Sequence, residues 1–131
     1  MITTRLTNKR IIDFKIQESN FITLSMSDGY TIATESLTRF IGSNNEFICS
    51  EDHGHKFGLN SSFDAEEIIK KLIKDKEIKK IDINKSTGDI DIVLDSGVFQ
   101  IICNSSGYEC YQVNGPDNFI IVGHGGKQRS T

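Results

Sequence analysis

Apolar and polar residues alternate most regularly between residues 78 and 103, in three short runs separated by two turn signals. The turns lie at 86–89 and 95–97, and each contains a glycine. Period-two alternation that is broken by Gly and Asp is typical of antiparallel strands joined by tight turns. The stretch 78–103 therefore predicts a three-stranded β-meander.

A fainter copy of this pattern lies between residues 10 and 34. Its first strand is expected to place Ile12, Phe14 and Ile16 on one face. When Gly29 is aligned with Gly97, the inward positions of the two middle strands superimpose, namely Ile22, Leu24 and Met26 on Ile90, Ile92 and Leu94. The match favours a duplicated meander. The alternative is that any two meanders with tight turns look alike.

One amphipathic helix is expected at about 64–75. Its apolar residues fall on a single stripe at helical spacing: Ala65, Ile68, Ile69, Leu72 and Ile73. Ser61 or Ser62 can cap its start, and carboxylates near the start and lysines near the end suit the helix dipole. Because the stripe is single, the helix covers one face of a sheet.

The remaining segments are shorter or less regular. Residues 1–9 are polar and fit an edge or a frayed end, and 42–62 is a loop rich in Gly, Asn and Ser that we expect to be mobile. Two further strands are expected at 108–113 and 119–122, and 127–131 fits a free tail.

These elements predict an α+β fold that is mainly antiparallel β, in which two β-meanders form a curved sheet or a sandwich and one amphipathic helix packs on it. The chain has 131 residues, 37% of them hydrophobic and 25% charged, which is ordinary for a single globular domain covering 1–131. Three cysteines without a C-x-x-C spacing, and the lack of an apolar signal or membrane-spanning run, indicate a cytoplasmic protein.

Charge narrows the choice of partner. A net charge of −3 argues against direct binding of nucleic acid, which calls for a basic face. Acidic residues that are candidates for binding a basic partner gather in the long loop, at the helix start and in the second meander: Glu51, Asp52, Asp64, Glu66, Glu67, Asp89 and Asp91. Asp89 and Asp91 should face outward together, because Ile90 and Ile92 face inward. The alternative is a face that only aids solubility.

Cys49, His53 and His55 are the closest approach to a metal site. A thiolate and two imidazoles suit zinc, but a closed site needs a fourth ligand and the spacing matches no zinc finger. A small metal- or ligand-binding regulator therefore stays as the alternative function.

Catalytic motifs are absent from the sequence, including nucleotide-binding loops, zinc-protease helices and nucleophile elbows. Cys110 with His124 would be a thiol and a base, but Cys110 falls inside a strand, where a thiol is usually a small core residue. We therefore expect no enzyme and no cofactor.

The segment 107–116 reads Gly-Tyr-Glu-Cys-Tyr-Gln-Val-Asn-Gly-Pro, and an apolar strand at 119–122 and a Gly-Gly pair at 125–126 follow it. This order, with the helix and the paired Gly-turn meanders before it, resembles a family of small bacterial proteins of uncharacterised domain type. Tyr111 stands where that family usually has Trp. Members are found as immunity proteins, including those of contact-dependent growth inhibition systems.

The resemblance implies an immunity protein that binds one cognate toxin domain and blocks its active site. Such toxin domains are commonly nucleases, and the acidic candidates favour a basic RNase bound 1:1, with no contact to nucleic acid or membrane. The resemblance implies no catalytic residue.

Overall fold

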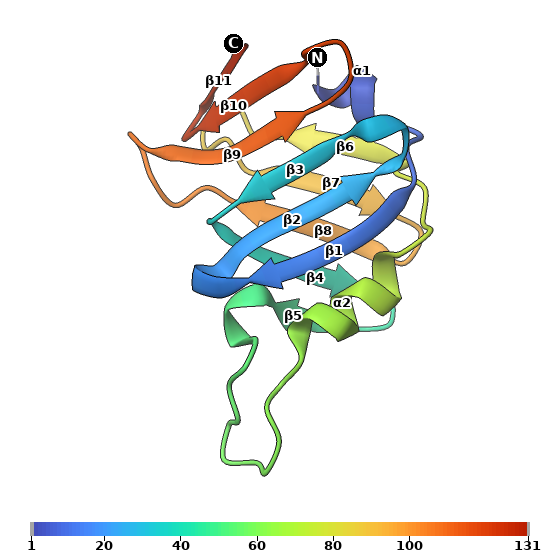
Figure 1. Cartoon of the computed structure of the whole chain (residues 1–131), viewed down its shortest axis with the longest axis vertical. Helices are drawn as coiled ribbons and strands as arrows, with labels where there is room; N and C mark the ends of the chain where they lie inside the picture. Colours follow the sequence, from blue (N-terminus) through green and yellow to red (C-terminus); the bar gives the residue numbers. More distant parts are fainter. Residues whose placement is uncertain (1, 131) are drawn as a thin grey trace.

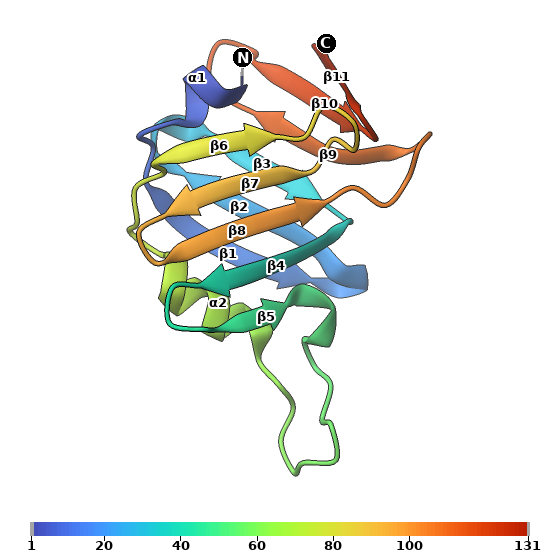
Figure 2. The ribbon, with the colours of Figure 1, turned by 180° about the vertical axis from the view of Figure 1, so that it is seen from behind.

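Residues 2–130, the part of the chain that the computed structural model describes, form two antiparallel sheets of six and five strands that lie face to face (Figures 1 and 2). The larger sheet contains, in spatial order, β1 (Ile11–Gln17), β2 (Phe21–Met26), β3 (Thr31–Thr34), β9 (Glu109–Asn114), β10 (Ile120–His124) and β11 (Lys127–Ser130). The smaller sheet contains β5 (Phe47–Cys49), β4 (Leu37–Gly42), β8 (Gly97–Ile102), β7 (Ile90–Leu94) and β6 (Lys80–Ile83).

The helices are α1 (Ile2–Leu6) and α2 (Ala65–Ile73). Short 3-10 turns occur at η1 (Glu18–Asn20), η2 (Ser27–Gly29) and η3 (Ser50–Asp52). The predicted fold class is confirmed, as a mainly antiparallel β sandwich with helices at its edges. No helix within residues 2–130 has both the length and the apolar character needed to span a membrane.

Both predicted meanders are present, and each belongs to a different sheet. Strands β1, β2 and β3 pair in order in one sheet, and β6, β7 and β8 pair in order in the other. Each meander is extended by a hairpin from the other half of the chain, since β9–β10 joins β3 and β4–β5 joins β8. The helices are arranged in the same reciprocal way, because α1, from the first half of the chain, packs on β6, and α2, from the second half, packs on β1. This reciprocal arrangement is the one expected of a duplicated unit.

The core lies between the sheets. The rings of Phe14 and Phe99 meet edge to face, with 5.6 Å between their centroids. From α2, Ala65, Ile69 and Ile73 are fully buried. Three of the five residues of the predicted stripe therefore face the core, whereas Leu72 is partly buried and Ile68 is 36% exposed. Burial of Ile69 and of Ile73 contributes roughly 2 kcal/mol each.

Two predictions for the N-terminal region are wrong. Ile12 is 44% exposed, because a β-bulge between Ile11 and Asp13 shifts the alternation and turns Ile11 inward in its place. Residues 1–9 were expected to be an edge or frayed, but Ile2 and Leu6 lie one helical turn apart in α1 and both are buried.

The predicted free tail at 127–131 is also wrong over the residues described. Residues 127–130 form β11, which pairs with β10, while Thr131 lies outside the described part of the chain. Polar edge strands carry little hydrophobic signal, so backbone pairing alone reveals them. The loop expected at 42–62 contains regular structure too, because β5 pairs with β4 and runs into η3.

Candidate protein-binding surface

Polar side chains occupy facing positions on four adjacent strands of the smaller sheet. Asp82 faces Asp91, Asp91 faces Gln100, and Gln100 faces Arg39. The Gln100 amide donates to Asp91 Oδ1 at 2.9 Å, and Arg39 Nε donates to Gln100 Oε1 at 2.6 Å. These bonds order the side chains of Asp91, Gln100 and Arg39. Together with the facing Asp82 they are here called the polar row (Asp82, Asp91, Gln100 and Arg39).

The polar row faces outward because its strands alternate. The residues next to it in sequence point into the core and are buried, namely Ile81, Ile92, Phe99 and Phe40. Carboxylates directly opposite each other, as on Asp82 and Asp91, are destabilising. Lys80 Nζ lies 3.4 Å from Asp82 and offsets part of this repulsion.

A hollow of about 310 Å³ lies over the polar row. Asp89 and Asp91 both line it, as their predicted shared face requires, and Asp82 and Asn84 join them. The Cys103 N–H donates to Asp89 Oδ1 at 2.7 Å, so this carboxylate also ties the start of β7 to the end of β8. Three carboxylates against one guanidinium make the hollow acidic.

The polar row leads to the acidic residues of the long loop. Arg39 faces Cys49 on β5, and β5 runs directly into η3, which carries Glu51 and Asp52. Neighbouring strands are about 4.8 Å apart, so the path from β6 to β5 spans about 19 Å. Figure 2 shows this sheet face with β5 at its lower edge. The smaller sheet thus connects two acidic groups that are distant in sequence, one over its β6–β8 strands and one beyond its β5 edge.

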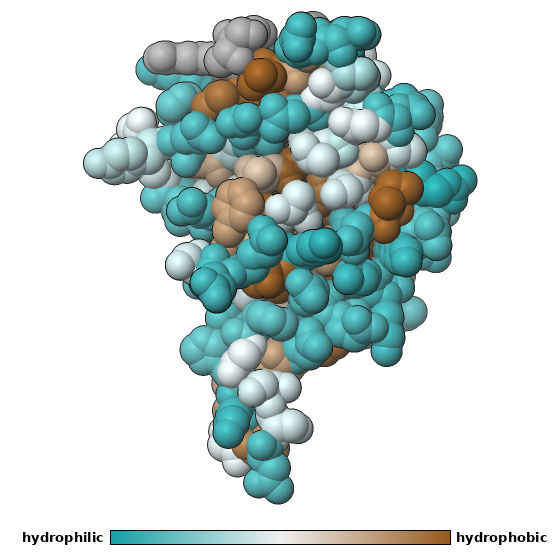
Figure 3. All heavy atoms as spheres, viewed as in Figure 1, coloured by the Kyte–Doolittle hydropathy of each residue, from teal (hydrophilic) through white to brown (hydrophobic). Residues whose placement is uncertain are grey.

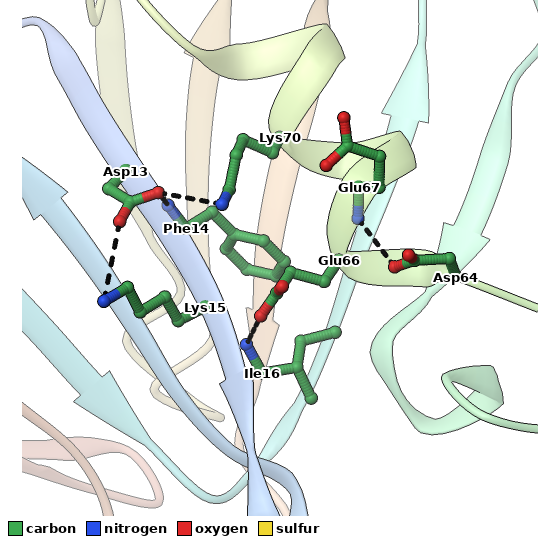
Figure 4. Close-up of polar contacts among 8 residues, drawn as sticks. All are labelled: Asp13, Phe14, Lys15, Ile16, Asp64, Glu66, Glu67 and Lys70. Atoms are coloured by element: carbon green, nitrogen blue, oxygen red, sulfur yellow. Dashed lines mark hydrogen bonds and ion pairs between the residues drawn. The ribbon is translucent and has the colours of Figure 1, made fainter.

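The carboxylates at the start of α2 have mainly structural partners (Figure 4). Asp64 caps the helix by accepting from the Glu67 N–H at 2.9 Å, the role that the sequence suggested for Ser61 or Ser62. Glu66 Oε1 accepts from the Ile16 N–H at 2.7 Å. Of the three predicted binding residues here, Asp64 and Glu66 therefore support the fold, although Asp64 is also exposed. Glu67 is exposed, and its Oε1 lies 3.8 Å from Lys71 Nζ.

Asp13 and Lys70 form a second link between β1 and α2. Lys70 Nζ lies 3.2 Å from Asp13 Oδ1, which also accepts from the Phe14 N–H at 2.9 Å. Burial acts to raise the pKa of Asp13, but the bonds from Lys70 and Phe14 outweigh it and hold the pKa below its ordinary value. The same ion pair raises the pKa of Lys70.

Residues 53–63 form a narrow projection, here called the finger, which extends away from both sheets (Figures 1 and 2). Two backbone bonds close its base, from the Gly54 N–H to the Phe63 carbonyl at 2.8 Å and from the Phe63 N–H to the His55 carbonyl at 2.7 Å. At its tip the Leu59 N–H donates to the Lys56 carbonyl at 2.8 Å. The finger is therefore an internally bonded structure.

Two large apolar side chains are exposed at the tip, Phe57 at 63% and Leu59 at 70%. Phe57 stacks on His55 with 5.8 Å between ring centroids and meets Phe63 edge to face at 6.1 Å. Its φ is 50° and that of Gly58 is 78°, the φ pattern of a type I′ turn. A left-handed conformation costs a residue with a Cβ about 1 kcal/mol.

Sequence reasoning missed the finger. The available signal was the Lys-Phe-Gly-Leu run inside a polar loop, where the two apolar residues flank a glycine. Figure 3 shows the projection as a mainly polar surface with a few apolar atoms among polar ones, so the exposed side chains form a small local feature.

Cys49, His53 and His55 do not come together as a metal site. His53 Nδ1 accepts from the Glu66 N–H at 3.4 Å and lies 3.7 Å from Asp64 Oδ1, while His55 stacks in the finger. Burial and the nearby Asp52 raise the pKa of the Cys49 thiol. Across residues 2–130, no group of three or more His, Cys, Asp or Glu side chains is placed to hold a metal ion.

Cys110 lies in the core, as its strand position suggests. Its thiol donates to the carbonyls of Ser105 at 3.6 Å and Tyr108 at 3.8 Å. Burial, with a hydrogen bond to Cys110, raises the pKa of Cys103 to about 12. Both thiols are thus placed as structural groups.

Comparisons of the chain with protein-family models, with curated proteins and with solved structures gave no match. The resemblance of residues 10–126 to an immunity-type family therefore stays a prediction.

Proposed function

We propose that the protein is a cytoplasmic immunity protein that binds a cognate bacterial toxin domain, a basic nuclease of the RNase class, in a 1:1 complex and blocks its active site. It acts by binding alone, with no catalysis and no cofactor. The observation that carries the proposal is the acidic hollow over the polar row, which Asp82, Asp89 and Asp91 line together on the outer face of the smaller sheet.

The physical support is charge complementarity. A nuclease needs a positively charged site to hold the phosphates of its substrate. Fixed carboxylates on a flat, ordered face complement such a site, speed the encounter and compete with nucleic acid. A cation from the partner should bind most favourably beside Asp82 and Asp91, because it relieves the repulsion between these two facing carboxylates.

The test is a titration of the protein with the toxin domain encoded beside its gene, by calorimetry at low and high salt. We expect a 1:1 complex that weakens as salt rises, and loss of nuclease activity in the mixture. In stopped-flow measurements of association, the double variant Asp82→Asn/Asp91→Asn should lower the association rate at least about tenfold at low salt and flatten its salt dependence.

The matched control is Asp117→Asn. Asp117 is exposed in the turn before β10 and has a φ of 59°, which asparagine also adopts readily. If this control slows association as much per charge as the double variant, net charge and not the hollow is responsible. Absence of binding by the unmodified protein at low salt would end the proposal.

A further inference from the structure

We propose that the finger is an insertion element whose tip residues, Phe57 and Leu59, enter an apolar cleft on the toxin domain. This inference rests on the proposed function and names the partner feature that the finger fits: an apolar cleft with a basic rim. The polar row then attracts and orients the partner, and the apolar contact of the finger slows dissociation of the complex.

The first support is exposure combined with order. Phe57 and Leu59 are 63% and 70% exposed at the end of a projection. Bonds at the base and the tip already fix the backbone, so binding would order few additional residues. A rigid aromatic anchor that fills a partner's pocket is the usual form of a strong contact in an interface.

The second support is backbone conformation. Phe57 occupies a left-handed position that asparagine or glycine would fill more easily. On a surface loop, the ring gains little from its loose contacts with His55 and Phe63. Backbone strain of this kind is kept at positions that serve a function. Presenting the aromatic ring of Phe57 to a partner would be such a function.

The third support is the charge around the base of the finger. Glu51, Asp52, Asp64 and Glu67 surround the two ends of the projection. A partner that receives the tip must place cations around its cleft to meet them, which fits a basic domain better than a second copy of this acidic chain. The finger and the polar row are joined through β5 and η3, so one partner can contact both.

The test uses Phe57→Asn, which removes the ring and suits the left-handed backbone. We expect a melting temperature no lower than that of the unmodified protein and at least about a 30-fold loss of affinity for the toxin domain, mainly through faster dissociation. Leu59→Ser should weaken binding in the same way. The loss should persist at high salt, where the contribution of the polar row is screened.

The matched control is Tyr108→Asn, because Tyr108 is 82% exposed and lies outside the finger. Its affinity should stay within about threefold of the unmodified protein. If Phe57→Asn and Leu59→Ser fold and bind as tightly as the unmodified protein, the finger inference is overturned and the proposed function stands. If the unmodified protein does not bind the toxin domain, both the finger inference and the proposed function are contradicted. A Phe57-dependent dimer with unchanged toxin affinity would assign the tip to self-association and also overturn the inference.

Discussion

The side chain of Glu66 accepts a hydrogen bond from the backbone N–H of Ile16 at 2.7 Å and so joins helix α2 to the outer edge of β1. Asp13 accepts from the Phe14 N–H on the same strand. Two N–H groups of a sheet edge are thereby given carboxylate partners, and the helix above shields them. An edge strand protected in this way is a poor template for pairing with another chain.

Removal of the Glu66 carboxylate should therefore destabilise the fold. For Glu66→Ala we expect a loss of about 1.5 kcal/mol in the free energy of unfolding, measured by urea denaturation, because the half-buried Ile16 N–H loses a charged partner. Glu66→Gln keeps an acceptor oxygen and should lose clearly less. Equal losses for the two variants would show that the hydrogen bond is not the stabilising contact.

The Asp13–Lys70 pair should give a stability difference that depends on pH. Because the folded-state pKa of Asp13 lies below its ordinary value of 3.8, its contribution is present above pH 3.8 and is lost as pH falls through the lowered pKa. Asp13→Asn should cost about 0.5–1 kcal/mol at pH 7, since the pair is partly exposed.

Urea unfolding at several pH values from 7 to 3 checks this pair. The difference in unfolding free energy between the unmodified protein and Asp13→Asn should be constant at higher pH and begin to shrink as pH approaches 3.8, and the difference for Lys70→Gln should shrink in the same range. A difference that does not change with pH would mean that shape or local hydrogen bonding, and not charge, explains the effect.

The two aligned turn glycines should respond differently to alanine. A Cβ at Gly97 would overlap the carbonyl oxygen of Ile41 and approach Gly42 Cα, on a neighbouring strand, whereas a Cβ at Gly29 meets nothing within 4 Å. Both residues have positive φ. Gly29→Ala should cost about 1 kcal/mol from backbone strain. Gly97→Ala should cost at least about 2 kcal/mol more, because β4 or β8 must shift. Thermal or urea unfolding of the two variants measures the difference, and similar losses would contradict the clash.

The Cys103 thiol should resist alkylation in the folded protein. With its pKa raised to about 12, the thiolate fraction at pH 8 is about one in ten thousand. Iodoacetamide labelling followed by mass spectrometry should modify Cys103 far more slowly in the folded protein than in urea. Rapid labelling of the folded protein at pH 8 would contradict the raised pKa of this half-buried thiol.

Local signals in the sequence predicted the local elements. The meanders and α2 were predictable because alternation, turn glycines and an apolar stripe are set by residues close together. The pairing of β3 with β9 and of β4 with β8 was not, since it joins segments such as Thr34 and Tyr111 that have no sequence signal for each other. The bulge beside Ile11 was hidden for a related reason, because the adjacent pair Ile11 and Ile12 allows either register.

Residues of the candidate surface were likewise predictable from sequence only where the signal is local. Asp91 was found because alternation fixes which face of its strand it occupies. Gln100 and Arg39 were missed, because they reach Asp91 through strand neighbours from two other parts of the chain. Glu66 was assigned to binding because its charge is visible in sequence, whereas its bond to Ile16 is visible only in the fold. Phe57 was missed because the Lys-Phe-Gly-Leu run does not show that the backbone of this residue is left-handed, a conformation seen only in the folded finger.

The position of the finger along the chain has an evolutionary consequence. It lies where the first half, with α1, one meander and one hairpin, connects to the second half, which begins with α2. Each additional residue in a closed loop costs little chain entropy. The connector between the halves can therefore change in length and sequence without disturbing either sheet, so new partner preferences can arise there while the sandwich is inherited unchanged.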